Sequence, residues 1–133
     1  MTDKPKILVV DDENLIVTMI KDTLEANNYH VITARDGEEG LARARTEKPD
    51  LIILDVMMPK LDGFKVARLL KFDVRYRHIP IIMLTARAGT ADRDISIKSG
   101  ADAYLVKPLD LVSLLTKIKE LLASGAQAGY KNP

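Results

Sequence analysis

Four charged residues of this chain stand where runs of apolar residues end. They are Asp11 and Asp12 after residues 7–10, Asp55 after residues 51–54, and Lys107 after residues 104–106. Three carboxylates in one place repel one another unless a cation lies among them. Oxygen ligands without histidine or cysteine favour a hard cation such as Mg²⁺, which usually also binds water and a phosphate oxygen. If the fold brings these residues together, they predict a site for magnesium and a phosphoryl group.

The apolar runs predict the elements that would position these residues. They are short and rich in Ile, Val and Leu, as strands buried on both faces of a parallel sheet are. A further run, residues 79–84, stops at Thr85. In such sheets the ligand crevice lies beyond the carboxyl ends of the strands, so we expect Thr85 to join the same site. A single aspartate after a strand is usually a loop residue or a helix cap. Three aspartates, a threonine and a lysine, all at the carboxyl ends of strands, favour a functional site.

Amphipathic patterns predict helices between the strands. They are expected at about residues 13–27, from an Asp36 cap to before Pro49, after the Asp62–Gly63 turn, at about residues 90–99, and over 111–122 with Asp110 as cap. The apolar stripes include Met19 and Leu69, which we therefore expect to be buried. With a short strand near residues 29–33, five strands alternate with five helices. This predicts an α/β fold, a parallel sheet with helices on both faces.

Composition limits the remaining possibilities. A chain of 133 residues with 47% apolar and 29% charged residues is expected to form one globular domain. A net charge of +1 suggests no bulk attraction for nucleic acid or membrane. Without cysteines or a long apolar run, the chain is expected to be soluble and cytoplasmic. Residues 124–133 lack periodicity and are expected to be a flexible tail or linker after a domain spanning residues 1–123.

Four motifs in order make the chain resemble the receiver domains of two-component response regulators. The resemblance covers about residues 5–123. It rests on the segments ILVVDDE (7–13), LDVMMP (54–59) with Asp62–Gly63, LTAR (84–87) and GADAYLVKP (100–108). Each segment alone is weak evidence, whereas the ordered set is highly specific. The resemblance implies a flavodoxin-like (βα)5 fold with strand order 2-1-3-4-5.

The resemblance also implies roles for the residues that bind metal. Asp55 would accept the phosphoryl group from a phosphohistidine, because phosphoryl transfer depends mainly on positioning and charge neutralisation. Asp12 and Asp55 would bind Mg²⁺ directly, together with the backbone carbonyl of Met57. Asp11 would act mainly through water, and Mn²⁺ could replace Mg²⁺. Glu13 is expected to be a charge at a helix N-terminus rather than a ligand.

Other residues would bind or report on the phosphoryl group. The resemblance implies that Lys107, Thr85 and the amide of Ala86 contact its oxygens, and that a cis Lys107–Pro108 bond aims the lysine. Thr85 and Tyr104 would form a switch between the site and a signalling face made by the fourth helix, the last strand and the last helix. Gly63 is expected to relieve backbone strain where a helix begins.

The expected protein is thus a signalling domain rather than a conventional enzyme, although it would promote its own phosphoryl transfer and dephosphorylation. Its partners would be a sensor histidine kinase or phosphotransfer protein, an effector that the sequence does not identify, and a second copy on phosphorylation. The alternative is a degenerate receiver that docks without phosphorylation. A flavodoxin or dinucleotide enzyme is disfavoured, because residues 11–13 are acidic and no glycine-rich turn follows the first strand. A haloacid-dehalogenase-type phosphohydrolase would need an aspartate where Met57 stands.

Overall fold

A single parallel sheet forms the centre of the molecule. The computed structural model describes residues 4–58, 60–85 and 100–131, with side chains as far as residue 124. The strands are β1 (Lys6–Val10), β2 (His30–Ala34), β3 (Leu51–Asp55), β4 (Ile81–Thr85) and β5 (Ala103–Val106). Their order is β2-β1-β3-β4-β5 and all neighbouring pairs are parallel. This confirms the predicted flavodoxin-like fold.

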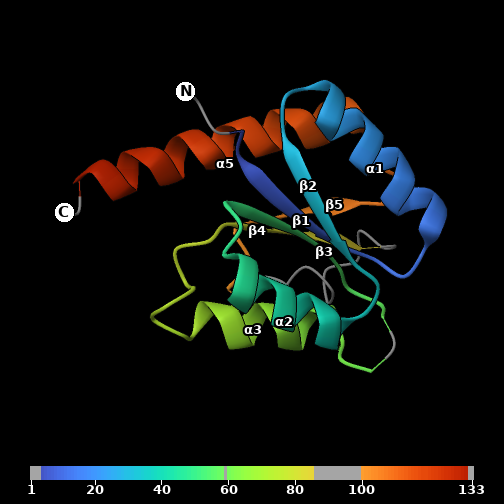
Figure 1. The fold of residues 1–133 in the computed structure, drawn as a ribbon, viewed down its shortest axis with the longest axis horizontal. Helices are drawn as coiled ribbons and strands as arrows, with labels where there is room; N and C mark the ends of the chain where they lie inside the picture. Colours follow the sequence, from blue (N-terminus) through green and yellow to red (C-terminus); the bar gives the residue numbers. More distant parts are fainter. Residues whose placement is uncertain (1–3, 59, 86–99, 132–133) are drawn as a thin grey trace.

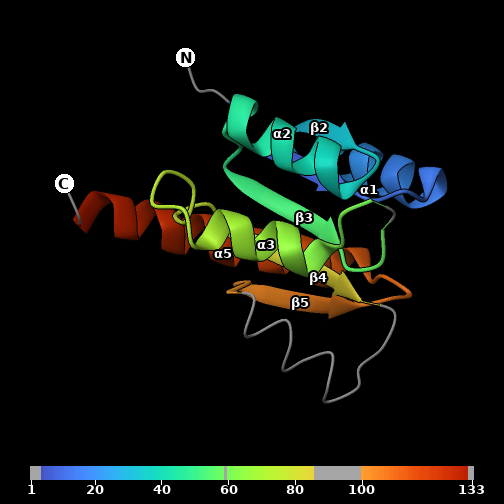
Figure 2. The same cartoon turned by 90° about the horizontal axis from the view of Figure 1, so that it is seen from below.

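Helices cover both faces of the sheet, as Figures 1 and 2 show. The described helices are α1 (Asn14–Ala26), α2 (Gly37–Glu47), α3 (Gly63–Lys71) and α5 (Leu111–Lys131). In Figure 1, α1 and α5 lie on one face while α2 and α3 lie on the other. The helix predicted at about residues 90–99 falls outside the described residues. Among the residues that are described, no helix is long and apolar enough to cross a membrane.

Strand residues alternate between two apolar layers because successive side chains of a strand point to opposite faces. On β1, for example, Leu8 packs on the side of α2 and α3, whereas Ile7 and Val9 pack on the side of α1 and α5. The central strands β1, β3 and β4 are almost wholly buried. Because helices cover both faces of these strands, almost every strand residue is apolar, and the apolar runs therefore predicted the strands.

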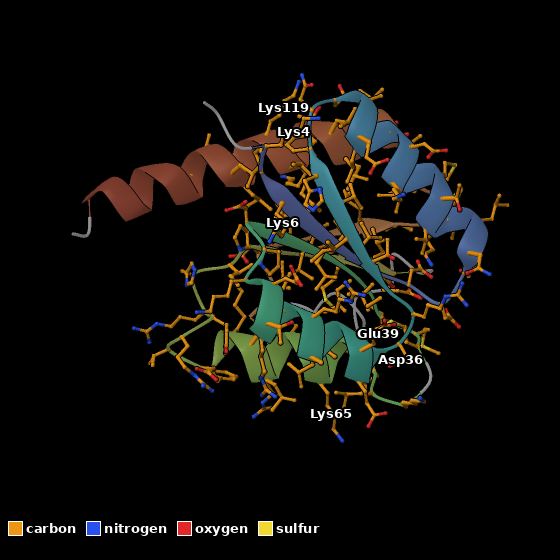
Figure 3. The ribbon with its side chains drawn as sticks, viewed as in Figure 1. Lys4, Lys6, Asp36, Glu39, Lys65 and Lys119 are labelled. Atoms are coloured by element: carbon orange, nitrogen blue, oxygen red, sulfur yellow. The ribbon has the colours of Figure 1, made fainter. Side chains whose placement is uncertain are left out.

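The start of α2 forms the capping arrangement that the sequence predicts. The Asp36 carboxylate accepts a hydrogen bond from the Glu39 amide at 2.9 Å, and the Glu39 carboxylate accepts one from the Arg35 amide at 2.8 Å. Figure 3 shows Asp36 and Glu39 close together at this helix end. These bonds satisfy backbone donors that have no partner inside the helix. At the other end, Lys48 adopts a left-handed conformation before Pro49.

Two apolar residues that we expected to be buried are exposed. Met19 on α1 is 40% exposed and Leu69 on α3 is 45% exposed. Their neighbours Ile20 and Leu70 occupy the buried stripes instead. Each helical residue turns about 100° from the one before it, so a residue at the margin of an apolar stripe can face solvent. The prediction of burial was wrong for these two positions.

The last helix is longer than expected. Helix α5 continues to Lys131, so residues 124–131 are helical. That residues 124–133 form a flexible tail or linker stays a prediction. Figure 1 shows α5 extending past the sheet. Extending a formed helix needs no new nucleus, and no proline lies between Pro108 and Pro133. The two glycines lower helix stability by about 1 kcal/mol each, which weakens a helix without ending it.

A buried lysine ties the end of α3 to the sheet. The Lys71 side chain is 10% exposed, and its ammonium lies 2.6 Å from the Asp102 carboxylate. The ammonium also donates to the carbonyls of Ile79 at 2.7 Å and Arg77 at 3.1 Å. Asp102 in turn accepts a hydrogen bond from the Ile81 amide at 2.8 Å. These contacts join α3 to the starts of β4 and β5.

Candidate functional site

The three aspartates meet at the carboxyl edge of the sheet. Strands β1 and β3 are neighbours in register, with Val10 opposite Leu54, so the residues that follow them lie together. One carboxylate oxygen from each of Asp11, Asp12 and Asp55 lies within 4.8 Å of the others. Asp11 and Asp55 are buried, whereas Asp12 is exposed. The predicted acidic group is therefore formed by the fold.

Lys107 reaches this group from the end of β5. Its ammonium lies 3.2 Å from an Asp11 oxygen and 3.3 Å from an Asp55 oxygen. It also lies 3.1 Å from the carboxylate of Glu13, the residue that precedes α1. From the sequence we expected Glu13 to be only a charge at a helix N-terminus, so its pairing with Lys107 was missed. The one available signal was that Glu13 directly follows Asp12. Three carboxylates thus share one ammonium.

Thr85 ends β4 beside the same edge. It is 5% exposed, and its carbonyl accepts a hydrogen bond from the Lys107 amide at 2.7 Å. Tyr104 lies one strand further out, opposite Met83, and packs partly buried against the core layer of α2 and α3. The Lys107–Pro108 peptide bond is cis, as predicted. Ala86 falls outside the described residues.

The turn after β3 holds the Asp55 backbone and side chain. The Met57 amide hydrogen-bonds to the Asp55 carboxylate, while the Met57 side chain is 74% exposed. Gly63 lies directly against Asp55, because a methyl group on Gly63 would overlap the Asp55 carbonyl oxygen. The backbone of Gly63 is not in the left-handed region. Our expectation about strain was therefore wrong, and close packing is the reason for glycine here.

The environment of Asp55 disfavours the ionised form of its carboxyl group. Burial and then the nearby Asp11 carboxylate raise its pKa from 3.8 to about 6, although Lys107 and the Met57 amide act in the opposite direction. For Lys107, burial lowers the pKa, but the Glu13 hydrogen bond and the charges of Asp11 and Asp55 outweigh it and the pKa is raised. Lys107 is therefore cationic at neutral pH, and Asp55 is more weakly ionised than an ordinary carboxyl group.

The donor set fits a hard divalent cation. The clustered side-chain donors are carboxylate oxygens, as magnesium and manganese prefer, and the group contains neither histidine nor cysteine. Counting Glu13, four carboxylates face one ammonium, which leaves an excess of negative charge. A divalent cation would reduce this excess and lower the pKa of Asp55. Asp12 is exposed, so an ion in solvent can reach its carboxylate.

Comparisons with known proteins agree with this geometry. The family model described as the response regulator receiver domain matches residues 7–119. The chain is 49% identical over 117 residues to the Bacillus subtilis alkaline phosphatase synthesis transcriptional regulatory protein PhoP, covering 88% of this chain and 48% of PhoP. It is 47% identical over 116 residues to the Caulobacter vibrioides response regulator PleD, covering 87% and 26%. The chain thus spans about half or less of these relatives.

Solved structures show the same fold. The chemotaxis response regulator CheY4 of Vibrio cholerae is 36% identical with a TM-score of 0.84, covering 89% of this chain and 98% of that one. The receiver domain of the Pseudomonas aeruginosa sensor histidine kinase PA1611, solved with a magnesium ion coordinated in its active site cleft, is 30% identical with a TM-score of 0.84, covering 90% and 98%. Fold, acidic edge and similarity agree: the chain belongs to the response regulator receiver domain family of two-component signalling.

Proposed function

We propose that this domain accepts a single phosphoryl group on Asp55 in a reaction that requires Mg²⁺ or Mn²⁺. The observation that carries the proposal is the surroundings of one buried carboxylate. Asp55 has a cationic Lys107 at 3.3 Å and carboxylate oxygens of Asp11 and Asp12 within 4.8 Å. An acceptor carboxylate, a cation for the transferred group and a set of metal-binding oxygens are the parts that phosphoryl transfer needs.

In the proposed reaction an Asp55 oxygen attacks the phosphorus of a phosphohistidine on a sensor histidine kinase or phosphotransfer protein. The new P–O bond forms as the P–N bond breaks, and the electron pair of that bond returns to the imidazole. With its pKa near 6, Asp55 is largely ionised at neutral pH and so carries the electron pair for attack. Asp12, Asp55 and the Met57 carbonyl would hold the metal, with Asp11 acting through water. When bound there, the metal would supply charge neutralisation for the phosphoryl oxygens.

The remaining polar groups would bind the transferred group. Lys107 would exchange its contact with Asp55 for a phosphoryl oxygen, because the phosphorylated carboxylate no longer carries its own charge. The Thr85 hydroxyl and the Ala86 amide would bind another oxygen. The same arrangement would promote later hydrolysis by water. The domain would therefore act as a signalling domain, whose active state lasts until the phosphoryl group is hydrolysed, rather than as a conventional enzyme.

The output would pass through Thr85 and Tyr104 to the face made by β5, α5 and the helix predicted at residues 90–99. This face would contact an effector domain or protein, or a second copy of the phosphorylated domain. Thr85→Ala should still accept phosphate from a small donor but lose most of the phosphorylation-induced amide shifts in β5. Coupling depends on differential stabilisation of two states, and the hydroxyl supplies part of that difference. Wild-type shifts in the variant would contradict the switch.

Intact-mass spectrometry after incubation with acetyl phosphate tests the central proposal. Wild type should gain one phosphoryl group with Mg²⁺ and none with excess chelator. Asp55→Asn should gain none, whereas Asp22→Asn, a change at an exposed α1 residue, should label normally. Labelling of Asp55→Asn would identify another acceptor. A wild type that never labels would favour the degenerate docking module.

A further inference from the structure

A groove lies between α2 and α3, on the face of the sheet that does not carry α1 and α5 (Figure 1). Its volume is about 960 Å³. It is lined by one residue of α2, by three residues of α3 and by the three residues that follow α3. These residues are Arg45, Lys65, Arg68, Leu69, Phe72, Asp73 and Val74. The proposed phosphoryl chemistry uses none of them.

Three apolar side chains of this groove face solvent. Leu69 is 45% exposed, Phe72 is 69% exposed and Val74 is 72% exposed. The described residues include seven large apolar side chains that are exposed, and these three lie together in one groove. The Arg68 guanidinium lies over the Phe72 ring at 5.5 Å and covers only part of it. Contiguous exposed apolar surface on a small domain typically marks an interaction site.

Three of the four charged residues that line the groove are cationic. The fourth, Asp73, is bonded to Arg75, and the charge of Arg45 adds to the lowering of the Asp73 pKa. Within the described part of the chain, Arg45, Lys65 and Arg68 make no ion pair, in contrast to Lys6, Lys71 and Lys107. Figure 3 shows Lys65 directed away from the sheet into solvent. Asp73, the one acidic lining residue, is held by Arg75 through contacts of 2.8 and 3.1 Å. The groove therefore presents an uncompensated positive charge beside an apolar surface.

Apart from Lys65, which lies near the start of α3, the groove residues lie away from the acidic site. Helix α3 starts at Gly63, beside Asp55, and its nine residues run about 13 Å at 1.5 Å per residue. Its last residue, Lys71, bonds to the backbone just before β4, at the amino edge of the sheet. Helix α2 ends near the same edge, where Glu47 pairs with Lys6 of β1. A molecule bound here would leave the phosphoryl edge open.

We propose that this groove binds an acidic amphipathic helix of a partner protein. Two adjacent helices leave a channel into which the side chains of a third helix can pack. Leucine-like residues on one face of that helix would cover Leu69, Phe72 and Val74. Aspartate or glutamate residues beside them would pair with Arg45, Lys65 and Arg68. The apolar floor favours such a helix over nucleic acid, which would offer phosphates but no apolar face.

Two matched peptides test the proposal on the intact, isotope-labelled domain. Each has about 16 residues with leucines at i, i+3, i+4 and i+7, and the flanking positions are all glutamate in one and all lysine in the other. The glutamate peptide should shift amide signals of Arg45 and of residues 65–74. The lysine peptide should bind at least about tenfold more weakly, because its charges meet Arg45, Lys65 and Arg68.

Paired variants locate the binding energy. Phe72→Ser and Val74→Ser should each weaken binding of the glutamate peptide by at least about tenfold, as loss of an interface anchor does. Val112→Ser is the matched control, since Val112 is also 72% exposed but lies on α5. Arg68→Glu should weaken binding similarly. Lys119→Glu should not, because Lys119 lies on the far side of the molecule, as Figure 3 shows.

Four outcomes would overturn the proposal. If about millimolar glutamate peptide caused no amide shifts, its dissociation constant would be too high for a specific binding site. Equal binding of polyglutamate would show attraction for any polyanion, and tighter binding of a DNA duplex would indicate nucleic acid. Concentration-dependent shifts at residues 65–74 without peptide would identify a second copy as the occupant. None of these outcomes depends on phosphorylation of Asp55, so failure here is separable from failure of the proposed function.

Discussion

The carboxyl edge of the sheet and the groove between α2 and α3 differ in whether their charged side chains are paired. At the carboxyl edge, Asp11 and Asp55 are buried and share the ammonium of Lys107. In the groove between α2 and α3, Arg68 and Lys65 make no ion pair with a carboxylate among the described residues, and Phe72 is exposed. A buried charge is costly unless the chain itself compensates it, whereas an exposed charge costs little. The acidic site is therefore recognised by the contacts among its own charged residues. The groove is recognised by basic side chains that make no ion pair.

The largest expected effect is a loss of phosphoryl labelling at the acidic site without a loss of peptide binding in the groove. Asp55→Asn should reduce labelling by acetyl phosphate at least about 100-fold, since it removes the attacking oxygen anion. The same variant should bind the glutamate peptide within about twofold of wild type, because the groove lies away from residue 55. Mass spectrometry and amide-shift titration on one preparation measure both quantities. A parallel loss of peptide binding would show that the acidic site and the groove are coupled.

A pair of neighbouring leucines tests the boundary between core and groove. Leu70 is 1% exposed, whereas Leu69, which we expected to be buried, is 45% exposed. Leu70→Ala should lower the free energy of unfolding by about 2–5 kcal/mol, as buried leucine truncations do. Leu69→Ala should change it by about 0.5 kcal/mol or less, the usual range for a surface position. Urea unfolding measures both, and equal losses would mean that Leu69 belongs to the core.

The sequence predicts the sheet and the acidic edge for a physical reason. Strands buried on both faces require unbroken apolar runs, so their ends are visible, and parallel strands must place Asp12, Asp55 and Thr85 at one edge. Local signals such as the Asp36 cap were equally readable, because both partners of the hydrogen bond lie within four residues.

The parts that the sequence did not predict depend on tertiary contact. The pairing of Glu13 with Lys107 joins residues 94 positions apart, and no local pattern indicates it. The exposure of Leu69 depends on how α3 is rotated against the sheet, which an apolar stripe defines only coarsely. Gly63 was misread because a glycine at a helix start suggests backbone freedom, whereas the determining neighbour is the Asp55 carbonyl.

A third prediction uses pH at the carboxyl edge. The pKa of Asp55 is about 6 in the folded protein against 3.8 for an ordinary aspartate, so between these values the folded state holds a proton that the unfolded state releases. Stability contributed by Asp55 is therefore present below pH about 4 and lost as pH rises through about 6. In chelator, the free energy of unfolding of wild type relative to Asp55→Asn should fall over this range.

Saturating Mg²⁺ sharpens that measurement. Binding to ionised carboxylates of the folded state should raise wild-type stability by ligand linkage and remove the fall at higher pH. Asp55→Asn should gain less, since it lacks one ligand. Urea unfolding at each pH, with chelator and then with Mg²⁺, provides the comparison. Parallel curves for the two proteins in chelator would contradict the burial argument for Asp55.

The smallest expected effect concerns the groove alone. Val74→Ser and Val112→Ser replace equally exposed valines and should each change the free energy of unfolding by about 0.5 kcal/mol or less. Both should label with acetyl phosphate at the wild-type rate, because neither side chain approaches Asp55. Only Val74→Ser should weaken binding of the glutamate peptide. A slower labelling rate for Val74→Ser would connect the groove to the phosphoryl edge and weaken the contrast between them.

The contacts of Lys71 make the acylation rate of its amine a measure of how often the surrounding structure opens. An amine reacts with an acylating reagent only when its lone pair is free and solvent can reach it. Lys71 donates to two carbonyls and pairs with Asp102 at 10% exposure, whereas Lys119 is exposed. Its acylation rate in the native protein should therefore report how often the junction between α3, β4 and β5 opens, with Lys119 giving the rate for an unprotected amine.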